Sequence, residues 1–167
     1  MTKAVHVSSK KIQDYATPQH LVDKIAARFG VEFVIDLAAS KHNKKAPHYI
    51  GEAENSLLCD WSGMVTASAE NQQVKKPCAW LNPPFALASP WMEKCKTESA
   101  KGCRIVSLTL SSLGSNWYRD HVEGNAMVYI LRKRVTFEGC DAPYTKELMV
   151  CLWGFGMTGL GYWDWSN

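Results

Sequence analysis

The chain has 167 residues, 46% of them hydrophobic, which suffices for one substantial core and is too few for two full-sized domains. The formal net charge of +3 permits a nucleic-acid partner without requiring one. The sequence contains neither the apolar stretch of a signal peptide nor an apolar run of membrane-spanning length. We therefore expect a single domain in the cytoplasm, with no membrane partner.

The six cysteines are scattered, without a CxxC pair, and several lie in apolar stretches. In a reducing compartment such residues are best interpreted as small buried hydrophobic side chains. A zinc site that includes Cys95, Cys103 and a histidine is a weak alternative, since the spacing matches no structural zinc pattern. We expect no metal.

The first half of the chain predicts a helix followed by strands and loops. Thr17 is placed to cap a helix that ends at Gly30, and apolar residues recur between them at helical spacing. The expected elements are an arm over 1–13, a helix over 18–29, a buried parallel strand over 31–37, a loop over 41–45, a short strand over 48–50 and a loop over 62–77.

The second half continues the alternation and then turns to strands. The expected elements are a strand over 78–81, a helix over 90–100, a strand over 104–110, a helical turn over 117–122 and strands over 127–131 and 148–155. This order predicts an α/β sheet with an antiparallel edge hairpin in one domain. We expect residues 156–167 to form an aromatic C-terminal tail, in which Trp163 and Trp165 are the tryptophans least expected to be buried.

The tetrapeptide Asn82-Pro83-Pro84-Phe85 follows an expected strand. An exocyclic aromatic amine is a poor nucleophile, because its lone pair is delocalised into the ring. The Asn82 side-chain oxygen and the Pro83 carbonyl can accept its two hydrogens and turn the lone pair toward a methyl donor. Pro84 holds Pro83 extended, and Phe85 can stack on the base. The alternative is a turn that merely ends the strand.

Further motifs accompany this tetrapeptide in one order: Asp14-x-x-Thr17-Pro18, Asp36-Leu-Ala-Ala39-Ser40, Asn55-Ser-Leu57, Asp60-Trp61, Trp80-x-Asn82-Pro-Pro-Phe85 and Trp91. Together they resemble the phage-type, Dam-like DNA N6-adenine methyltransferases, from about Asp14 to Phe137. The resemblance implies a Rossmann-like methyltransferase sheet over residues 14–155, S-adenosylmethionine as cofactor and adenine in double-stranded DNA as substrate. A phage-encoded enzyme would act in the cytoplasm of a bacterial host.

The resemblance also assigns residues to the cofactor. Thr17 and Pro18 would lie against its methionine part, which suits a helix N-terminus whose free N–H groups face a carboxylate. Asp36 would face the methionine ammonium group, and the small Ala38 would let the backbone approach the ligand.

Two features depart from the common methyltransferase pattern. The segment that begins at Asp36 lacks the glycine-rich form common in other methyltransferases. Asn55 matches a position that is usually acidic and that bonds the cofactor adenine, and Asp60 competes with it for that role. These departures leave open a non-catalytic DNA-binding module on the same fold.

Basic residues in the expected loops are candidates for phosphate contacts, which need only charge at a suitable position. The candidates are Lys44, Lys45, Arg132 and Arg134. Sequence readout would have to come from loops over 62–77, 111–125 or 138–147. Asn-Pro-Pro-aromatic sites also serve methyltransferases of a protein glutamine amide or an RNA guanine amine, so these substrates remain alternatives.

Overall fold

The computed structural model describes residues 15–166, so the arm expected over residues 1–13 lies outside the described part. Seven strands form one sheet in the order β2-β1-β3-β4-β6-β5-β7. Their bounds are β1 (Glu32–Asp36), β2 (His48–Tyr49), β3 (Pro77–Leu81), β4 (Ile105–Leu110), β5 (Ala126–Leu131), β6 (Leu148–Trp153) and β7 (Gly159–Trp163). All neighbouring pairs are parallel except those of β6, which runs antiparallel to β4 and to β5. The predicted α/β class and the antiparallel pair are confirmed.

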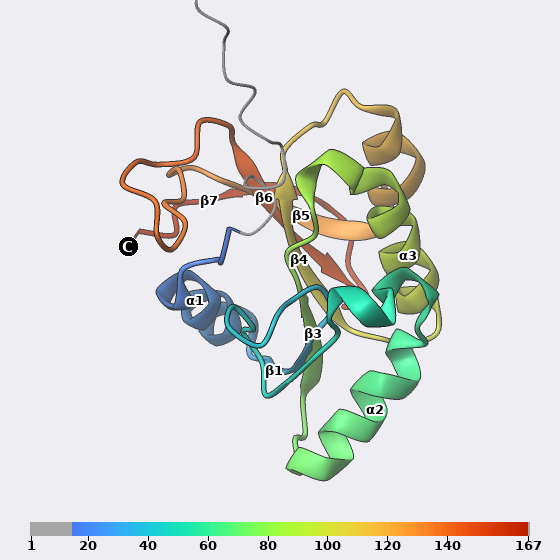
Figure 1. The fold of residues 1–167 in the computed structure, drawn as a ribbon. Coiled ribbons are helices and arrows are strands. Elements are labelled where there is room, and N and C mark those ends of the chain that lie inside the picture. Colours follow the sequence, from blue (N-terminus) through green and yellow to red (C-terminus); the bar gives the residue numbers. More distant parts are fainter. Residues whose placement is uncertain (1–14, 167) are drawn as a thin grey trace, which may run out of the picture.

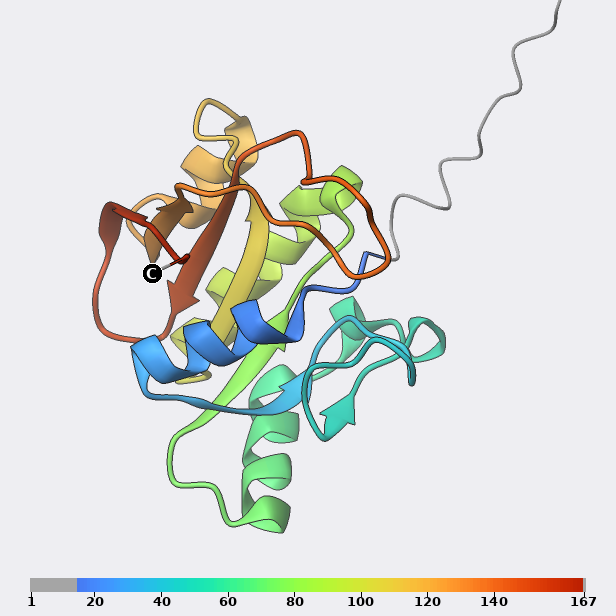
Figure 2. The same cartoon turned by 90° about the vertical axis from the view of Figure 1, so that its left-hand side faces the viewer.

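Helices cover both faces of this sheet, as Figures 1 and 2 show. α1 (Gln19–Phe29) lies on one face, and α2 (Trp61–Gln72) and α3 (Ala88–Ala100) lie on the other. Shorter turns are the 3-10 turns Glu52–Glu54, Ser56–Leu58 and Phe85–Leu87 and the π-helical turn Tyr118–Val122.

The strands alternate between two hydrophobic clusters. In β3, Cys78 and Trp80 pack into the cluster on the α1 face, whereas Ala79 and Leu81 pack into the cluster beneath α2 and α3. Successive side chains of a strand point to opposite faces, so a sheet covered on both sides needs apolar residues at every position. This explains why the central strands β3, β4 and β6 are almost entirely apolar, with Ser107 and Thr109 of β4 as buried polar exceptions.

The loop expected over residues 62–77 is wrong for most of its length, because α2 occupies residues 61–72. Its polar and small residues have modest helix propensity, so the sequence pattern did not indicate a helix. The helix buries Trp61, Val65, Ser68 and Ala69, whose spacing of four, three and one residues places them on one face. Tertiary packing of this narrow stripe against β1 and β3 outweighs the local preference.

The segment over residues 156–167, expected as a tail, contributes the edge strand β7, which pairs in parallel with β5. Trp163 and Trp165 are both buried. The Arg28 guanidinium of α1 lies 5.0 Å from the centroid of the Trp163 ring, and the Trp165 indole N–H donates to the Lys133 carbonyl at 2.8 Å. Residues 159–165 therefore pack as part of the sheet and of the α1 face.

All six cysteines are free thiols, four of them buried and Cys59 and Cys140 partly buried. Burial raises the pKa of Cys151 to about 12, which keeps this thiol protonated. Between residues 15 and 166 no group of three or more His, Cys, Asp and Glu side chains is arranged to hold a metal ion. None of the helices in that range has the length and apolar character that crossing a bilayer requires.

Glu98 joins α2 to α3 through a buried carboxylate. It accepts the backbone N–H of Ser62 at 3.0 Å and the ammonium groups of Lys94 and Lys101 at 2.8 and 2.9 Å. Burial alone would favour the protonated acid, but these bonds prevail and lower the pKa of Glu98 to about 2. The ionised carboxylate therefore stabilises the fold above its ordinary pKa of 4.5, and this contribution is lost as the pH falls toward 2.

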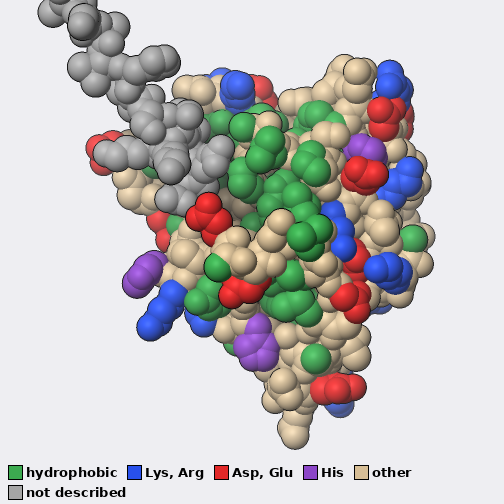
Figure 3. All heavy atoms as spheres, turned by 45° about the vertical axis from the view of Figure 1, so that its right-hand side comes forward, with side chains coloured by type: hydrophobic (Ala, Val, Ile, Leu, Met, Phe, Trp, Pro, Cys, Tyr) green, Lys and Arg blue, Asp and Glu red, His purple; other side chains and the backbone are tan. Residues whose placement is uncertain are grey.

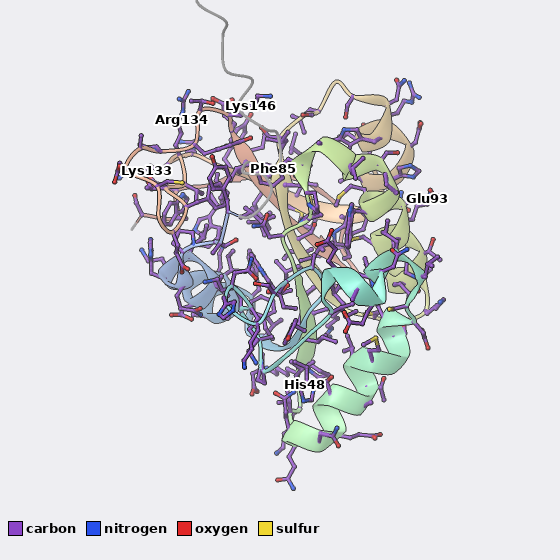
Figure 4. All side chains as sticks on the ribbon, viewed as in Figure 1. His48, Phe85, Glu93, Lys133, Arg134 and Lys146 are labelled. Atoms are coloured by element: carbon purple, nitrogen blue, oxygen red, sulfur yellow. The ribbon has the colours of Figure 1, made fainter. Side chains whose placement is uncertain are left out.

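Replacing Glu98 with glutamine is expected to lower the free energy of unfolding by about 2–3 kcal/mol at pH 7, because two ammonium groups lose their shared counter-charge. Urea unfolding followed by circular dichroism measures this loss. Glu93→Gln is the matched control, since Glu93 is exposed on the same helix (Figure 4). Equal stability losses in the two variants would contradict the role given to Glu98.

Candidate active site

The candidate site lies where the direction of strand addition reverses. From β1 the chain adds β2 on one side and later β3 on the other, and in such sheets the crevice at the carboxyl ends of the two strands is the usual ligand site. Asp36 is the last residue of β1, and Asn82 directly follows β3. The sheet register pairs Asp36 with Trp80. The two predicted polar residues therefore lie at the same edge of neighbouring strands.

The side chain of Asn82 is held by two bonds from its amide nitrogen. Nδ2 donates to the Tyr15 carbonyl and to Thr17 Oγ1, each at 3.1 Å. Its oxygen Oδ1 is buried and has no hydrogen-bond partner among the described residues. Because both nitrogen contacts are acceptors, they fix the orientation of the amide and leave Oδ1 as a free acceptor. A buried acceptor without a donor costs free energy, so the position calls for an explanation.

Thr17 does not cap α1, contrary to the expectation. The helix is preceded by Pro18 and has no side-chain cap bond, and the buried Thr17 hydroxyl instead accepts the Asn82 amide. The first helical N–H, that of Gln19, donates to Glu138 Oε1 at 3.2 Å. An acid from a distant loop therefore takes the place of the expected cap.

Asp36 is a buried carboxylate, 3% exposed. Its two oxygens accept the backbone N–H groups of Ala38 and Lys45 at 3.2 and 2.9 Å. Burial raises the pKa of Asp36 from its ordinary value of 3.8 to about 6, although both bonds act in the opposite direction. The loop after β1 therefore folds over an acid that is ionised near neutral pH and lacks full compensation for its burial.

A small polar pocket of about 30 Å³ connects these groups. Residues 15–17 before α1, Asp36 and Ala38 after β1, and Asn82 after β3 contribute to its wall. Asn43, Lys45 and Trp80 complete the lining. The structure thus brings together the predicted Thr17, Asp36, Ala38 and Asn82.

Pro83, Pro84 and Phe85 continue from Asn82 to the start of α3. Pro84 adopts φ −55° and ψ 117°, and Phe85 begins the 3-10 turn that leads into α3. The Phe85 ring lies 5.6 Å from the Tyr144 ring and 6.2 Å from the Phe137 ring, centroid to centroid. Phe85 is therefore part of an aromatic group with Phe137 and Tyr144.

The loop over residues 132–147, between β5 and β6, brings this aromatic group to the segment before α1 (Figure 2). Tyr15 stacks on Phe137 with centroids 5.4 Å apart, and the Glu138 N–H donates to the Ala16 carbonyl at 2.9 Å. Phe137, Glu138 and Tyr144 were not among the predicted site residues. Their loop offers no motif, and only the long-range contacts with residues 15–19 reveal the role of these residues.

Asn55 and Asp60 lie outside the pocket lining. Asn55 is exposed, with φ +47°, between two 3-10 turns. Asp60 precedes α2, and its carboxylate lies 4.0 Å from the Lys101 ammonium group, so it faces the carboxyl end of α3. Both residues stay candidates for the adenine contact.

The four basic candidates differ in exposure. Lys44 donates to the Pro47 carbonyl at 2.8 Å within its own loop. The Lys45 side chain is only 7% exposed and pairs with Glu138 at 2.8 Å. Arg132 and Arg134 are exposed on the loop over residues 132–147. Figure 4 shows Arg134 there with the exposed Lys133 and Lys146.

Exposed apolar side chains add to the surface near the start of α3. Figure 3 shows hydrophobic side chains gathered on one face, with charged groups around them. Leu58 is 81% exposed and Leu87 56% exposed. They end two 3-10 turns that both contact α3.

Comparison with known proteins connects this geometry to a family. Residues 5–148 match the family model described as DNA N-6-adenine-methyltransferase (Dam). The chain belongs to this family. It is also 28% identical, over 139 residues, to the DNA N-6-adenine-methyltransferase of Haemophilus phage HP1, covering 82% of this chain and 72% of that protein. The Dam family and the enzyme class predicted from the sequence are confirmed.

Proposed function

We propose that this Dam-family chain transfers a methyl group from S-adenosylmethionine to the N6 amino group of adenine in double-stranded DNA. The observation that carries the proposal is the buried, unpartnered Oδ1 of Asn82, held in place by two bonds from Nδ2. An amino group of a flipped base supplies the donor that this oxygen lacks. Family membership supports DNA as the substrate.

The catalytic segment acts by positioning. Asn82 Oδ1 accepts one amino hydrogen of adenine and the Pro83 carbonyl accepts the other, so the nitrogen lone pair turns out of the ring plane. Pro84 fixes its own φ at −55° and restricts Pro83, which keeps the carbonyl rigid. Phe85 stacks on the base outside the duplex. No general base is required, because the methylated ammonium product is strongly acidic.

The pocket wall suits the amino-acid part of S-adenosylmethionine, whose sulfonium group supplies the methyl in its bound form. Asp36 carries an incompletely compensated negative charge, which an ammonium group would neutralise. Thr17, Pro18 and Ala38 line or adjoin this wall. The exposed Asn55 would reach the cofactor adenine, and Leu58 and Leu87 offer apolar contact area.

We also propose that residues 14–155 form a Rossmann-like methyltransferase domain, closed at its edge by β7. Three features support it: the parallel strands β2-β1-β3-β4, the antiparallel β6 beyond them and a candidate site at the β1/β3 reversal.

DNA contact is proposed for the exposed basic residues of the loop over residues 132–147, with Lys44 as a further candidate. Arg134→Gln is expected to weaken DNA binding by about 1 kcal/mol. The slope of log K against log salt concentration should fall by about one, the loss of one phosphate contact. Fluorescence anisotropy with a DNA duplex over a salt series measures both. Arg104→Gln is the control, since Arg104 precedes β4 at the opposite end of the sheet. Equal losses in the two variants would argue against this loop.

The proposed function is tested with isotope-labelled S-adenosylmethionine and three acceptors: unmethylated DNA, RNA and protein. Label is expected in DNA alone. Label confined to RNA or protein would assign the alternative amino-group substrates. Absence of both transfer and cofactor binding would point to a non-catalytic DNA-binding module.

A further inference from the structure

A carboxylate site is already formed at the start of α1. Glu138 Oε1 accepts the Gln19 N–H at 3.2 Å and the Lys45 ammonium at 2.8 Å. The Lys45 side chain is 7% exposed, whereas that of Glu138 is 45% exposed. A nearly buried ammonium group and the first N–H of an 11-residue helix both favour an anion. The protein thus uses a half-exposed acid to satisfy a nearly buried cation.

This carboxylate site adjoins the candidate active site. Lys45 lines the same pocket as Asp36 and Asn82, and its backbone N–H binds Asp36. The pocket wall therefore presents one buried negative group, Asp36, and one buried positive group, Lys45. An α-amino acid in its zwitterionic form carries the complementary pair of charges, an ammonium group and a carboxylate.

Glu138 Oε1 already occupies the position that the carboxylate of such a ligand would take beside Lys45 and the Gln19 N–H. Glu138, which would have to move, belongs to the loop over residues 132–147. That loop is joined to the start of α1 by the Glu138 contacts and by the bond from the Glu138 N–H to the Ala16 carbonyl.

We propose that Lys45 and the Gln19 N–H bind the α-carboxylate of S-adenosylmethionine, and that Glu138 occupies this site as an internal competitor until the cofactor displaces it. The inference rests on the proposed function, because it assumes that the chain binds this cofactor. It assigns Lys45 to the cofactor instead of to DNA. Displacement of Glu138 also breaks its side-chain contacts with Gln19 and Lys45, which join the loop over residues 132–147 to the start of α1.

The test is calorimetry with S-adenosylhomocysteine, which keeps the amino-acid group, and with 5′-methylthioadenosine, which lacks it. Glu138→Gln removes the competing charge and is expected to bind S-adenosylhomocysteine about three- to tenfold more tightly than the wild type. Lys45→Met is expected to bind it at least about tenfold more weakly. Both variants are expected to bind 5′-methylthioadenosine as the wild type does.

Glu147→Gln is the matched control, an equal charge change in the same loop at a residue that pairs with Arg134 at 3.6 Å; its affinity should match that of the wild type. Unchanged S-adenosylhomocysteine affinity in Glu138→Gln would overturn the inference. If Glu138→Gln bound both ligands more tightly by the same factor, the inference would also be overturned. Glu138 would then hinder binding of the nucleoside itself and would not compete with the carboxylate. Failure of the wild type to bind either nucleoside would instead contradict the proposed function.

Discussion

Replacing Asn82 with alanine is expected to slow methyl transfer to adenine by about 10²–10³-fold, the usual effect of removing one positioned hydrogen-bond partner from a reacting group. The reason is the loss of Oδ1, the buried acceptor without a partner. Single-turnover kinetics with saturating cofactor and DNA measure the transfer step. Cofactor affinity, measured by calorimetry, should stay within a few-fold of the wild type.

Asn82→Asp separates the two halves of this side chain. Aspartate keeps the acceptor but loses the two Nδ2 bonds, to Tyr15 and Thr17, so its rate should fall between those of the wild type and the alanine variant. Near-normal transfer by Asn82→Ala would show that Oδ1 does not bind the amino group. Unfolding curves confirm that each variant is folded.

Replacing Asp36 with asparagine is expected to weaken binding of S-adenosylmethionine by about 2–4 kcal/mol, because a buried ammonium group loses its counter-charge. Calorimetry measures this loss. Binding by the wild type should also weaken as the pH falls below about 6, where Asp36 becomes protonated. The exposed Asp141→Asn is the control and should leave affinity unchanged. Equal affinity in wild type and Asp36→Asn would contradict the proposed ammonium contact.

The same substitution is expected to stabilise the free protein at pH 7.5. Because folding raises the pKa of Asp36 from 3.8 to about 6, its ionisation costs the folded state about 3 kcal/mol above pH 6. Asparagine avoids this cost but loses one accepted bond, which leaves a net gain of about 1–2 kcal/mol.

The gain should depend on pH. The cost of ionising Asp36 in the wild type is present above the folded pKa and disappears as the pH falls from about 6 to 3.8. The advantage of Asp36→Asn in thermal unfolding should therefore shrink over that range. A variant less stable than the wild type at pH 7.5 would show that Asp36 serves the fold itself.

The sequence predicts the central elements of the fold because they depend on strong local signals. Helix α1 has an apolar stripe and Gly30, which adopts φ +63°. Strands β3 and β6 are continuous apolar runs, and β1 and β4 are mostly apolar. Helix α2 and strand β7 lack such signals. Helix α2 forms because Trp61 and Val65 pack against the sheet, and strand β7 forms because it pairs with β5.

Some residues of the candidate site could likewise be predicted from the sequence, and others could not. Asp36 and Asn82 were predictable, because polar residues that directly follow apolar strands lie at one edge of a parallel sheet. Glu138 was not, since its partners Gln19 and Lys45 are 119 and 93 residues away in the chain. The burial of Lys45, which was predicted as a DNA contact, was not predictable either, because it accompanies a pairing with the distant Glu138.

The central claim is that the Asn82 segment presents the N6 amino group of adenine for methylation. The most direct measurement is mass spectrometry of nucleosides from unmethylated double-stranded DNA incubated with S-adenosylmethionine and either the wild type or Asn82→Ala. We predict N6-methyladenine with the wild type and little or none with the variant. Methylation of cytosine in place of adenine, or equal N6-methyladenine from both proteins, would contradict the account.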